Sequence, residues 1–417
     1  MDTGYTDRVL YAEKVWEVAW RRGSLESNYS RSSVKAVRKN TARGWIIISG
    51  PSSMKWDELL HRLQRISSHI KPKSLESVRL YNGKVMLGQH SSSPEEELFK
   101  IISRASGLLE EKGVSGEVIA TYYETIRKIE HSSGVAEEYK SACELYVFAE
   151  IVAGGKRSVG SVMYSWIWGP AALSGKELEK LVDRAVNRAL AGLKAKQMSP
   201  LEWGRIDTVL SSEASAALLH EISHLLEADQ PEHFRRNTRI TSEDIIVRDD
   251  PYQPTSPASR AFDDEAVQTV RRTLVENGVV VDNLHTLETA YLENSKPGSA
   301  YGLFHKPKAL HTNLVVEPGD WREREIIEET KRGVFIDSVI SAEIRGNIIT
   351  IIPETAWLIE KGEISKPVLL EKVKIPVPQG LYTISAIGKN LSRRISYEKR
   401  YVVSESAPWI RLQAYVS

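Results

Sequence analysis

The chain has 417 residues, of which 41% are hydrophobic, and its 56 Lys and Arg residues almost balance its 55 Asp and Glu residues. This length favours two domains, or one domain with a large accessory layer. The near-neutral charge argues against a global electrostatic footprint for nucleic acid or an anionic membrane. The single cysteine, Cys143, excludes an internal disulfide framework. The start shows no basic stretch followed by an apolar one, and no apolar run approaches the roughly 20 residues of a membrane span. We therefore expect a cytoplasmic protein.

The first third of the chain combines two expected helices with an expected hairpin. Apolar residues recur at helical spacing over residues 8–21 and again over 55–67, which predicts two amphipathic helices. Residues 78–87 carry Asn82 and Gly83 at their centre, and both residue types tolerate the positive φ of a type I′ turn. This pair predicts a β-hairpin.

Two later helices are indicated by capping boxes, in which a hydroxyl and a carboxyl three residues apart satisfy backbone donors of the first turn. Ser93 and Glu96 have this spacing and predict a helix that runs to about residue 112. Ser174 and Glu177 repeat it before a long series of apolar residues at helical spacing. A second capped helix is therefore expected from residue 174.

The remaining segments favour strands. Residues 118–129 and 142–153 are β-rich, and the basic stretch 31–43 is best explained as a solvated strand edge. Beyond residue 230 the chain shows period-two patterns and frequent Asn-Gly, Pro-Gly and Gly-Asn turns. These patterns predict a predominantly antiparallel β region.

The stretch 195–202 is a plausible domain boundary. We therefore predict an α+β fold with an N-terminal α/β domain, residues 1–195, and a C-terminal β-rich domain, residues 196–417. A helix that is expected to begin at Ser211, shortly after this boundary, should lie at the junction of the two domains.

A fifth helix is expected to begin at Ser211, Ser212 and Glu213, because hydroxyls cap orphan backbone donors and the helix dipole favours an acid there. The residues that follow are apolar almost all round the helix axis, which predicts a buried helix: Ala214, Ala217, Leu218, Leu219, Ile222, Leu225 and Leu226. Four ionisable residues are set among them: His220, Glu221, His224 and Glu227. Burying such groups is costly unless each is paired or bound to a metal.

The spacing of these four residues favours a zinc site. His220 and His224 are four residues apart, which is about 40° around a helix, so both imidazoles can converge on one ion. Glu221 can act as the general base towards a water whose pKa zinc lowers to near 7. Glu227 suits a carboxylate that orients an imidazole. The alternative is two core histidines bonded to backbone carbonyls and a glutamate paired with an arginine.

At this point the sequence resembles the TldD/PmbA family of intracellular metallopeptidases, once called modulators of DNA gyrase. The helix matches the family's Leu-Leu-His-Glu-x-x-x-His-Gly-Leu-Glu-Gly-Asp, and several later segments match as well. The matching segments are Leu218-Leu219-His220-Glu221, His224, Leu226-Glu227-Ala228-Asp229, Asp263-Asp264-Glu265, Arg272 to Gly278, His305 through Thr312-Asn313, Pro318-Gly319, Lys331 to Phe335 and Trp357 to Ile364.

The resemblance implies an α/β N-terminal domain, a β-rich C-terminal domain and zinc as the cofactor. It also implies a homodimer, or a heterodimer with a non-catalytic paralogue, and cleavage of short or unfolded peptides inside an enclosed cavity. The match covers most of residues 118–417 and, more loosely, the N-terminal third.

The chain departs from the family in two ways. The family has three residues between the histidines, whereas His220 and His224 are separated by two, which is the ordinary spacing of zinc peptidases. The family's third ligand is a cysteine near the C-terminus, and this chain has none there. Cys143 lies in an expected N-terminal strand and is expected to be a small buried packing residue.

The third metal ligand is therefore open. The equivalent region is 394–406, where Glu398 or Glu405 can supply a carboxylate oxygen, although either can equally be a solvated charge. His305 and His311 are further candidates as ligand, transition-state donor or substrate contact. Alternatively, each is a loop histidine that is held by hydrogen bonds and has no role in a site.

The leading interpretation is a zinc-dependent peptidase that accepts peptides as extended strands, with main-chain pairing supplying affinity. The first alternative is a non-catalytic partner or peptide-binding subunit with a degenerate metal site. Glu221 argues against it, because a scaffold has no need of a general base. The second alternative, a regulatory DNA-associated protein, is disfavoured by the near-neutral charge and by the lack of a recognisable nucleic-acid module.

Overall fold

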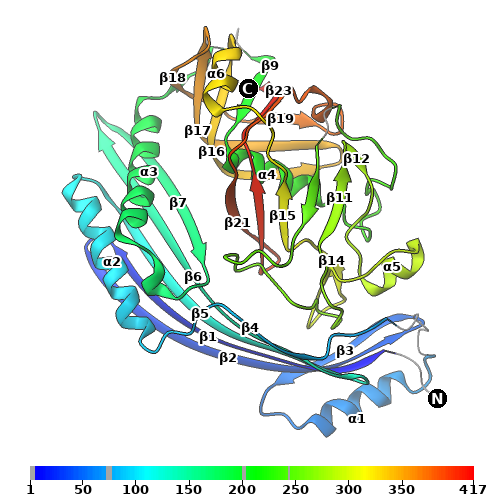
Figure 1. Ribbon diagram of the computed structural model, residues 1–417. Coiled ribbons are helices and arrows are strands. Elements are labelled where there is room, and N and C mark those ends of the chain that lie inside the picture. The colour runs from blue at the N-terminus through cyan, green and yellow to red at the C-terminus, as the bar shows by residue number, and fades with distance from the viewer. Residues whose placement is uncertain (1–4, 72–77, 200–202, 243–244) are drawn as a thin grey trace.

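The computed structural model describes residues 5–71, 78–199, 203–242 and 245–417. The N-terminal residues form a long curved sheet that runs along one side of a β-rich body and then beneath it (Figure 1). This confirms the α+β fold with a β-rich C-terminal region. The helices are α1 (Trp56–Ser67), α2 (Pro94–Glu111), α3 (Gly175–Lys194), α4 (Ser212–Ser223), α5 (Leu287–Glu293) and α6 (Glu323–Glu329), with short 3-10 turns at Pro170–Ala172 and Leu381–Thr383.

The curved sheet has the strand order β3-β2-β1-β5-β6-β4, with β7 also paired to β6. Its pairs are antiparallel except β4 with β6. Helices α2 and α3 bury their apolar sides against one face of β5, β6 and β7, where Cys143 is fully buried in the shared core. The strands are β1 (Thr6–Arg21), β2 (Ser24–Thr41), β3 (Gly44–Pro51), β4 (Gly83–Leu87), β5 (Ser115–His131), β6 (Gly134–Ala153) and β7 (Lys156–Trp166).

The prediction of a helix over residues 8–21 is wrong, because these residues form β1. This strand pairs with β2 and β5 along almost its whole length. Its apolar residues serve two faces: Val9 packs in one cluster beneath the β-rich body, and Val18 packs in the other beneath α2. Their spacing fits either period, and pairing with distant strands decides the outcome.

The predicted hairpin at 78–87 is also wrong. Gly83 begins β4, which pairs in parallel with β6, while the backbone N–H of Tyr81 donates to the carbonyl of Ala266 at 2.7 Å. Asn82 uses its side chain instead, accepting a hydrogen bond from the backbone N–H of Val135 at 3.2 Å. A polar side chain bound to a distant loop therefore replaces the expected turn.

The other helix predictions are confirmed. Helix α1 occupies the expected range 55–67, and α2 ends at Glu111, close to the expected end. The capping box of α3 forms between Ser174 and Glu177, whereas Ser93 makes no side-chain cap at the start of α2.

The β-rich body contains two main sheets with a shared apolar core. One has the order β12-β11-β10-β15-β22-β21, and the other runs β16-β9-β23-β19-β17-β18-β8 and closes through an extra β16–β17 pairing. Most pairs are antiparallel, as predicted, but β9–β16, β15–β22 and β8–β18 are parallel. The strands are β8 (Lys196–Gln197), β9 (Gly204–Leu210), β10 (Val247–Asp249), β11 (Arg272–Glu276), β12 (Val279–Val280), β13 (Ala300–Tyr301), β14 (Lys308–Ala309), β15 (Asn313–Val316), β16 (Arg332–Arg345), β17 (Ile348–Glu360), β18 (Glu363–Leu369), β19 (Val373–Pro376), β20 (Ala386–Ile387), β21 (Ser392–Glu398), β22 (Tyr401–Ala407) and β23 (Ile410–Val416).

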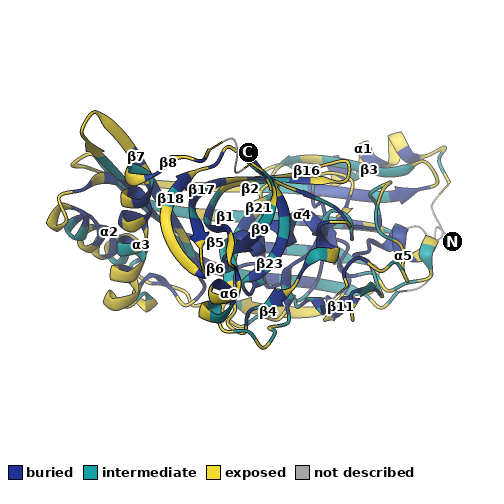
Figure 2. Ribbon diagram, turned by 90° about the horizontal axis from the view of Figure 1, so that it is seen from above, coloured by how far each residue is buried: buried dark blue, intermediate teal, exposed yellow. Residues whose placement is uncertain are grey.

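Helix α4 lies inside the β-rich body, and residues Ala214 to Ser223 are all buried (Figure 2). Its first turn reaches α3, because the Glu213 carboxylate pairs with Arg188 at 2.6 Å and with Arg184 at 2.9 Å. The helix therefore stands where the two parts of the molecule meet. The division of the chain after residue 195 stays a prediction, and residues 200–202 of the expected boundary lie outside the described residues.

A group of buried charges joins the curved sheet to the β-rich body. We call it the junction cluster, and it consists of Asp7, Arg38, Arg127, Glu138, Arg260 and Asp264. Arg38 Nε donates to Asp7 Oδ1 at 2.8 Å, and Arg38 Nη1 donates to the carbonyl of Gly302 at 2.9 Å. Arg127 Nη1 donates to Asp264 Oδ1 at 2.7 Å. Arginines of the sheet therefore hold acids and carbonyls of the body.

Arg38 also corrects the expectation that residues 31–43 form a solvated strand edge. Arg31 and Ser32 are exposed, because β3 pairs with β2 only from Val34 onward. Arg38 lies further along β2, between two neighbouring strands, and is fully buried. Only the first part of the stretch is an edge.

Among the residues that the structure describes, no helix combines the length and the apolar character that crossing a membrane requires.

Candidate metal centre

Helix α4 begins as the sequence predicts and ends earlier. The Ser211 hydroxyl accepts a hydrogen bond from the backbone N–H of Ala214 at 3.2 Å, which caps the helix. His224 is the C-cap residue with helical φ and ψ. Leu225, Leu226 and Glu227 therefore lie beyond the helix, although the apolar pattern had predicted that it continues through them.

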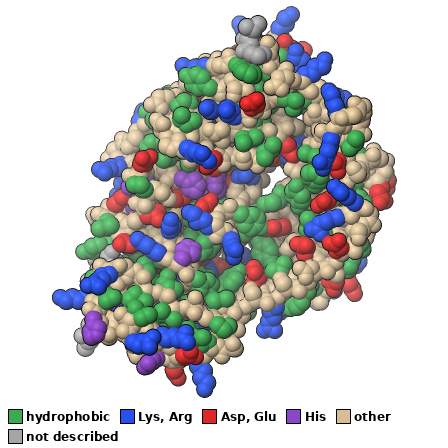
Figure 3. All heavy atoms as spheres, turned by 180° about the vertical axis from the view of Figure 1, so that it is seen from behind, with side chains coloured by type: hydrophobic (Ala, Val, Ile, Leu, Met, Phe, Trp, Pro, Cys, Tyr) green, Lys and Arg blue, Asp and Glu red, His purple; other side chains and the backbone are tan. Residues whose placement is uncertain are grey.

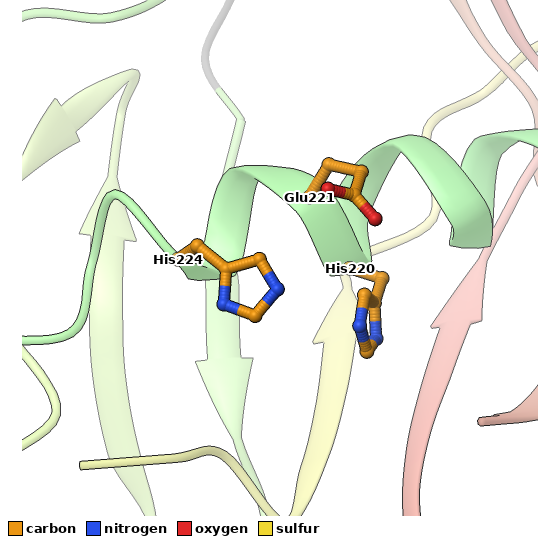
Figure 4. Close-up of side chains that lie close together, drawn as sticks. All are labelled: His220, Glu221 and His224. Atoms are coloured by element: carbon orange, nitrogen blue, oxygen red, sulfur yellow. The ribbon is translucent and has the colours of Figure 1, made fainter. Parts of the chain in front are cut away.

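The last turn of α4 brings His220, Glu221 and His224 together. One potential ligand atom from each of these residues lies within 4.8 Å of the others. The two imidazole rings are 5.3 Å apart between centroids and nearly perpendicular, and Figure 4 shows them on the same side of the helix. His220 and Glu221 are almost fully buried, at 8% and 7% exposure. The four-residue spacing thus has the geometric effect expected of it.

Each histidine is held by a carboxylate through the same ring nitrogen. His220 Nδ1 is 2.7 Å from Glu405 Oε1, and His224 Nδ1 is 2.8 Å from Glu227 Oε1. Glu405 and Glu227 are 0% and 2% exposed, so neither carboxylate is a solvated charge. A carboxylate that binds Nδ1 fixes the ring orientation and leaves Nε2 as the free ligand atom.

Glu398 approaches the free side of His220. Its Oε2 atom is 3.9 Å from His220 Nε2, and Lys399 Nζ lies 3.0 Å from its other oxygen. Two atoms that bind one tetrahedral zinc at about 2.0–2.1 Å are roughly 3.4 Å apart. Glu398, at the end of β21, therefore approaches His220 from the Nε2 side, although it belongs to neither group of potential ligands whose atoms all lie within 4.8 Å of one another.

The carboxylates favour positive charge at His220 and His224. Burial alone would lower the pKa of His220, but the nearby carboxylates of Glu398 and Glu405 outweigh it and raise the pKa to about 10. Burial would also lower the pKa of His224, but the hydrogen bond with Glu227 outweighs this effect, so the pKa of His224 is raised. The nearby imidazole of His220 lowers the pKa of Glu398 to about 2. Two imidazoles among several ionised carboxylates form a donor set that suits zinc.

Glu221 differs from the other carboxylates of the site. Its Oε2 atom accepts one hydrogen bond, from the backbone N–H of Ile344 at 2.8 Å. Burial raises the pKa of Glu221, and the neighbouring His220 and His224 counteract this only in part. A carboxylate with a raised pKa next to the imidazoles accepts a proton more readily than an exposed glutamate does.

The two other candidate histidines have different surroundings. His311 is fully buried, and its Nε2 atom is 3.0 Å from Glu405 Oε1, so it belongs to the hydrogen-bond network behind His220. It also forms a second group of potential ligands with His220 and Glu405. His305 lies in neither group found among the described residues. It is exposed, and its Nε2 atom is 3.2 Å from the Tyr401 hydroxyl.

Sequence reasoning missed Arg394 and Ser396. The Ser396 hydroxyl donates to Glu405 Oε2 at 2.7 Å, and Arg394 Nη1 lies 3.5 Å from the same oxygen. The alternation of polar residues at 394, 396 and 398 with Ile395 and Tyr397 is a signal that places all three polar side chains on one face of a strand.

Figure 3 shows that histidine side chains gather on the β-rich body beside a hollow that separates it from the curved sheet.

Comparisons with known proteins relate the chain to metallopeptidases. The family profile of the PmbA/TldA metallopeptidase C-terminal domain matches residues 203–415. A metalloprotease of Methanocaldococcus jannaschii is 29% identical over 249 residues, which are 55% of this chain and 54% of that protein. A zinc metalloprotease TldD homolog of Saccharolobus solfataricus is 27% identical over 44% of each chain. The chain thus spans about half the length of these curated relatives.

Two solved structures share the fold. A Thermotoga maritima protein named for modulation of a DNA gyrase superposes with a TM-score of 0.81 at 17% identity, covering 99% of this chain and 96% of that one. TldE from Thermococcus kodakarensis superposes with a TM-score of 0.80 at 16% identity and the same coverage. At such identities the likeness concerns the fold alone.

Proposed function

The chain belongs to the PmbA/TldD metallopeptidase family, and from that premise we propose that it is a zinc-dependent peptidase that hydrolyses short or unfolded peptides. One observation carries the proposal: His220 and His224 each have Nδ1 held by a buried carboxylate, at 2.7 and 2.8 Å. This arrangement leaves both Nε2 atoms available one helical turn apart, next to the Glu221 carboxylate. Core histidines that serve packing alone have no need of such paired carboxylates.

We propose Glu398 as the third zinc ligand. It lies on the Nε2 side of His220, whereas Glu405 binds the opposite ring nitrogen. Glu405 and Glu227 then act as partners that orient the two imidazoles, and His311 holds Glu405 in place. A carboxylate in this position takes the place of the family's cysteine, and ligand sets of two histidines and one carboxylate occur in other zinc peptidases.

Zinc, when bound, supplies Lewis acidity, which polarises a peptide carbonyl and lowers the pKa of a water molecule towards 7. Glu221 accepts the proton of the attacking water and passes it to the amide nitrogen that leaves. The raised pKa of its carboxylate suits both transfers. The hydrogen bond from the backbone of Ile344 to Oε2 fixes the carboxylate, so that Oε1 is the atom that exchanges the proton.

We propose that the peptide binds as an extended strand along β21. This strand ends the six-stranded sheet and, among the described residues, pairs only with β22. Its free edge offers backbone donors and acceptors to a further strand, and it leads to Glu398. Main-chain pairing of this kind accepts varied side chains, as a peptidase for unfolded chains requires.

The cellular setting is part of the same proposal. The absence of a disulfide framework supports a cytoplasmic location, and the family resemblance supports a homodimer or a heterodimer with a paralogue. The alternative function is a non-catalytic partner or peptide-binding subunit with a degenerate metal site, which the missing C-terminal cysteine favours. The presence of Glu221 beside both histidines favours the peptidase.

The Glu221→Gln variant tests the proposal. We expect it to hold one zinc per chain, as the parent does, and to cleave a mixed peptide library about 100-fold to 10,000-fold more slowly, because the general base is lost. Glu232→Gln, which changes an exposed glutamate, is the matched control and should retain full activity. Equal activity of Glu221→Gln and the parent would contradict the mechanism, and a parent that binds peptides without cleaving them would favour the non-catalytic alternative.

A further inference from the structure

Arg394 presents an underused guanidinium group beside the candidate metal centre. It lies on β21, two and four residues before Ser396 and Glu398, so all three side chains lie on the same face of the strand. Glu405 links this face to the histidines, because Oε1 contacts His220 at 2.7 Å while Oε2 lies 3.5 Å from Arg394 Nη1. The guanidinium is therefore one carboxylate away from the metal-binding imidazole.

Much of its hydrogen-bonding capacity is free. Nη1 donates to the Ser396 hydroxyl, but Nε and Nη2 have no hydrogen-bond partner among the described residues. The side chain of Arg394 is 28% exposed, so these donors are open to a ligand. An arginine fork is suited to bind a carboxylate through two parallel hydrogen bonds.

The neighbouring arginine on the same strand shows the contrast. Arg393 lies on the opposite face of β21, and its Nη1 and Nη2 atoms donate to the hydroxyl and carbonyl of Thr255 at 2.8 and 2.9 Å. Its Nη2 atom also donates to the carbonyl of Ser165 at 3.3 Å. Arg393 is thus committed to holding the strand in place, whereas Arg394 is not.

Glu405 does not need Arg394 as its partner. Its oxygens already have His220 at 2.7 Å, His311 at 3.0 Å and the Ser396 hydroxyl at 2.7 Å. The approach of Arg394 at 3.5 Å is longer than these contacts and longer than an ordinary charge-assisted hydrogen bond. A structural ion pair therefore does not account for the guanidinium.

We propose that Arg394 binds a carboxylate of the peptide substrate, which makes this chain selective for peptides that carry a negative charge a few residues from the cleaved bond. The inference rests on the proposed function and on a substrate strand beside β21. Strand residues advance about 3.3 Å each, so the four residues from Glu398 to Arg394 span roughly 13 Å. The carboxylate belongs either to the C-terminus of the peptide or to an Asp or Glu side chain, and both have the same chemistry at Arg394.

Equilibrium binding to the zinc-loaded Glu221→Gln protein tests the proposal without turnover. The probes are four fluorescent peptides of one apolar sequence: the free acid, its C-terminal amide, an amide with Glu four residues from the end, and the corresponding Gln amide. We expect at least one carboxylate peptide to bind about tenfold to a hundredfold more tightly than its neutral match, as a charge-assisted hydrogen bond allows. Preference for the free acid assigns the C-terminus, and preference for the Glu peptide assigns an acidic side chain.

The variants decide whether Arg394 is responsible. Arg394→Gln should lose the preference while keeping its zinc, and Arg394→Lys should retain part of it, because the charge remains and the fork is lost. Arg324→Gln removes the same charge from a side chain that is 87% exposed on α6, and the preference should survive. Three outcomes would each overturn the proposal: survival of the preference when Arg394→Gln is added to the Glu221→Gln protein, equal binding of all peptides by the Glu221→Gln protein, or loss of zinc from the double variant. Failure of every peptide to bind would instead refute the proposed peptidase function, and the inference with it.

Discussion

The molecule buries ionisable groups in two places, and the two groups are balanced differently. In the junction cluster three arginines face three acids, and each acid contacts at least one guanidinium. At the candidate metal centre four carboxylates lie around His220 and His224, and Lys399 and Arg394 approach two of these acids. The acids there are Glu221, Glu227, Glu398 and Glu405. Both groups lie next to the same interface between the curved sheet and the β-rich body.

The difference teaches how to separate a structural charge cluster from a binding site. Buried charges are tolerated where each is paired, and the junction cluster satisfies this condition from within the chain. At the candidate metal centre, by contrast, the carboxylates raise the pKa of His220 to about 10 against the effect of burial, so they favour positive charge at the imidazole. Buried imidazoles and carboxylates whose potential ligand atoms lie within 4.8 Å of one another therefore mark a candidate site for a cation.

The largest expected effect comes from breaking the junction cluster. Arg38→Met should lower the free energy of unfolding by about 3–5 kcal/mol, because it leaves the Asp7 carboxylate buried without its cation. Urea unfolding measures the change. The double variant with Asp7→Asn should recover part of the loss, and a single variant as stable as the parent would show that the cluster is not paired as described.

Zinc should stabilise the metal centre by a somewhat smaller amount. At a free zinc concentration about one hundred times its dissociation constant, the stability gain is about 2.7 kcal/mol. Thermal unfolding of chelator-treated protein, with and without zinc, reports this gain. His220→Ala should abolish it, whereas His61→Ala, which changes an exposed histidine on α1, should keep it. A gain that survives in His220→Ala would place the ion elsewhere.

Acid should weaken the junction cluster through Asp264. Burial opposes ionisation, but Arg260 and Arg127 outweigh it and lower the pKa of Asp264 to about 2. Its stabilising contribution is therefore complete above its unfolded-state pKa of about 3.9 and is lost as the pH falls from about 4 to 2, which amounts to about 2–3 kcal/mol. Urea unfolding at pH 5 and pH 2 should show a smaller loss in Asp264→Asn than in the parent or in the exposed control Asp320→Asn. Equal losses in all three proteins would contradict this assignment.

The smallest expected effects concern the carboxylates that orient the histidines. Glu405→Gln and Glu227→Gln should each weaken zinc binding by about tenfold to a hundredfold, because the acceptors at Nδ1 lose their negative charge and make the imidazoles less basic. Competition with a chromophoric chelator measures the affinity, and Glu232→Gln serves as the control. Unchanged affinity in both variants would mean that the contacts do not support metal binding.

The candidate metal centre could be predicted from the sequence only where its residues lie close together along the chain. His220, Glu221 and His224 share one helical turn, so their convergence follows from helix geometry alone. Glu398 and Glu405 reach them from a distant pair of strands, and no local pattern distinguishes them from solvated charges. The family resemblance indicated region 394–406 as the source of a third ligand. Only the structure shows which ring nitrogen Glu398 and Glu405 each approach.

The fold, too, could be predicted only where residues close along the chain determine the structure. Helices α1 and α3 follow from apolar periodicity, and the α3 capping box confirms its start. The apolar residues of β1 satisfy that periodicity too, and the strand forms because β2 and β5 pair with it on both sides. Arg38 was expected at a strand edge for a similar reason, since its partners Asp7 and Gly302 come from distant segments. Local spacing therefore predicts elements that stabilise themselves and fails where distant contacts decide.

Anomalous scattering at the zinc edge, from crystals grown with zinc, tests the central claim most directly. The account predicts one peak per chain, within about 2.0–2.2 Å of His220 Nε2, His224 Nε2 and a carboxylate oxygen of Glu398. A peak between His220 Nδ1, His311 and Glu405, or no peak near α4 at all, would contradict it.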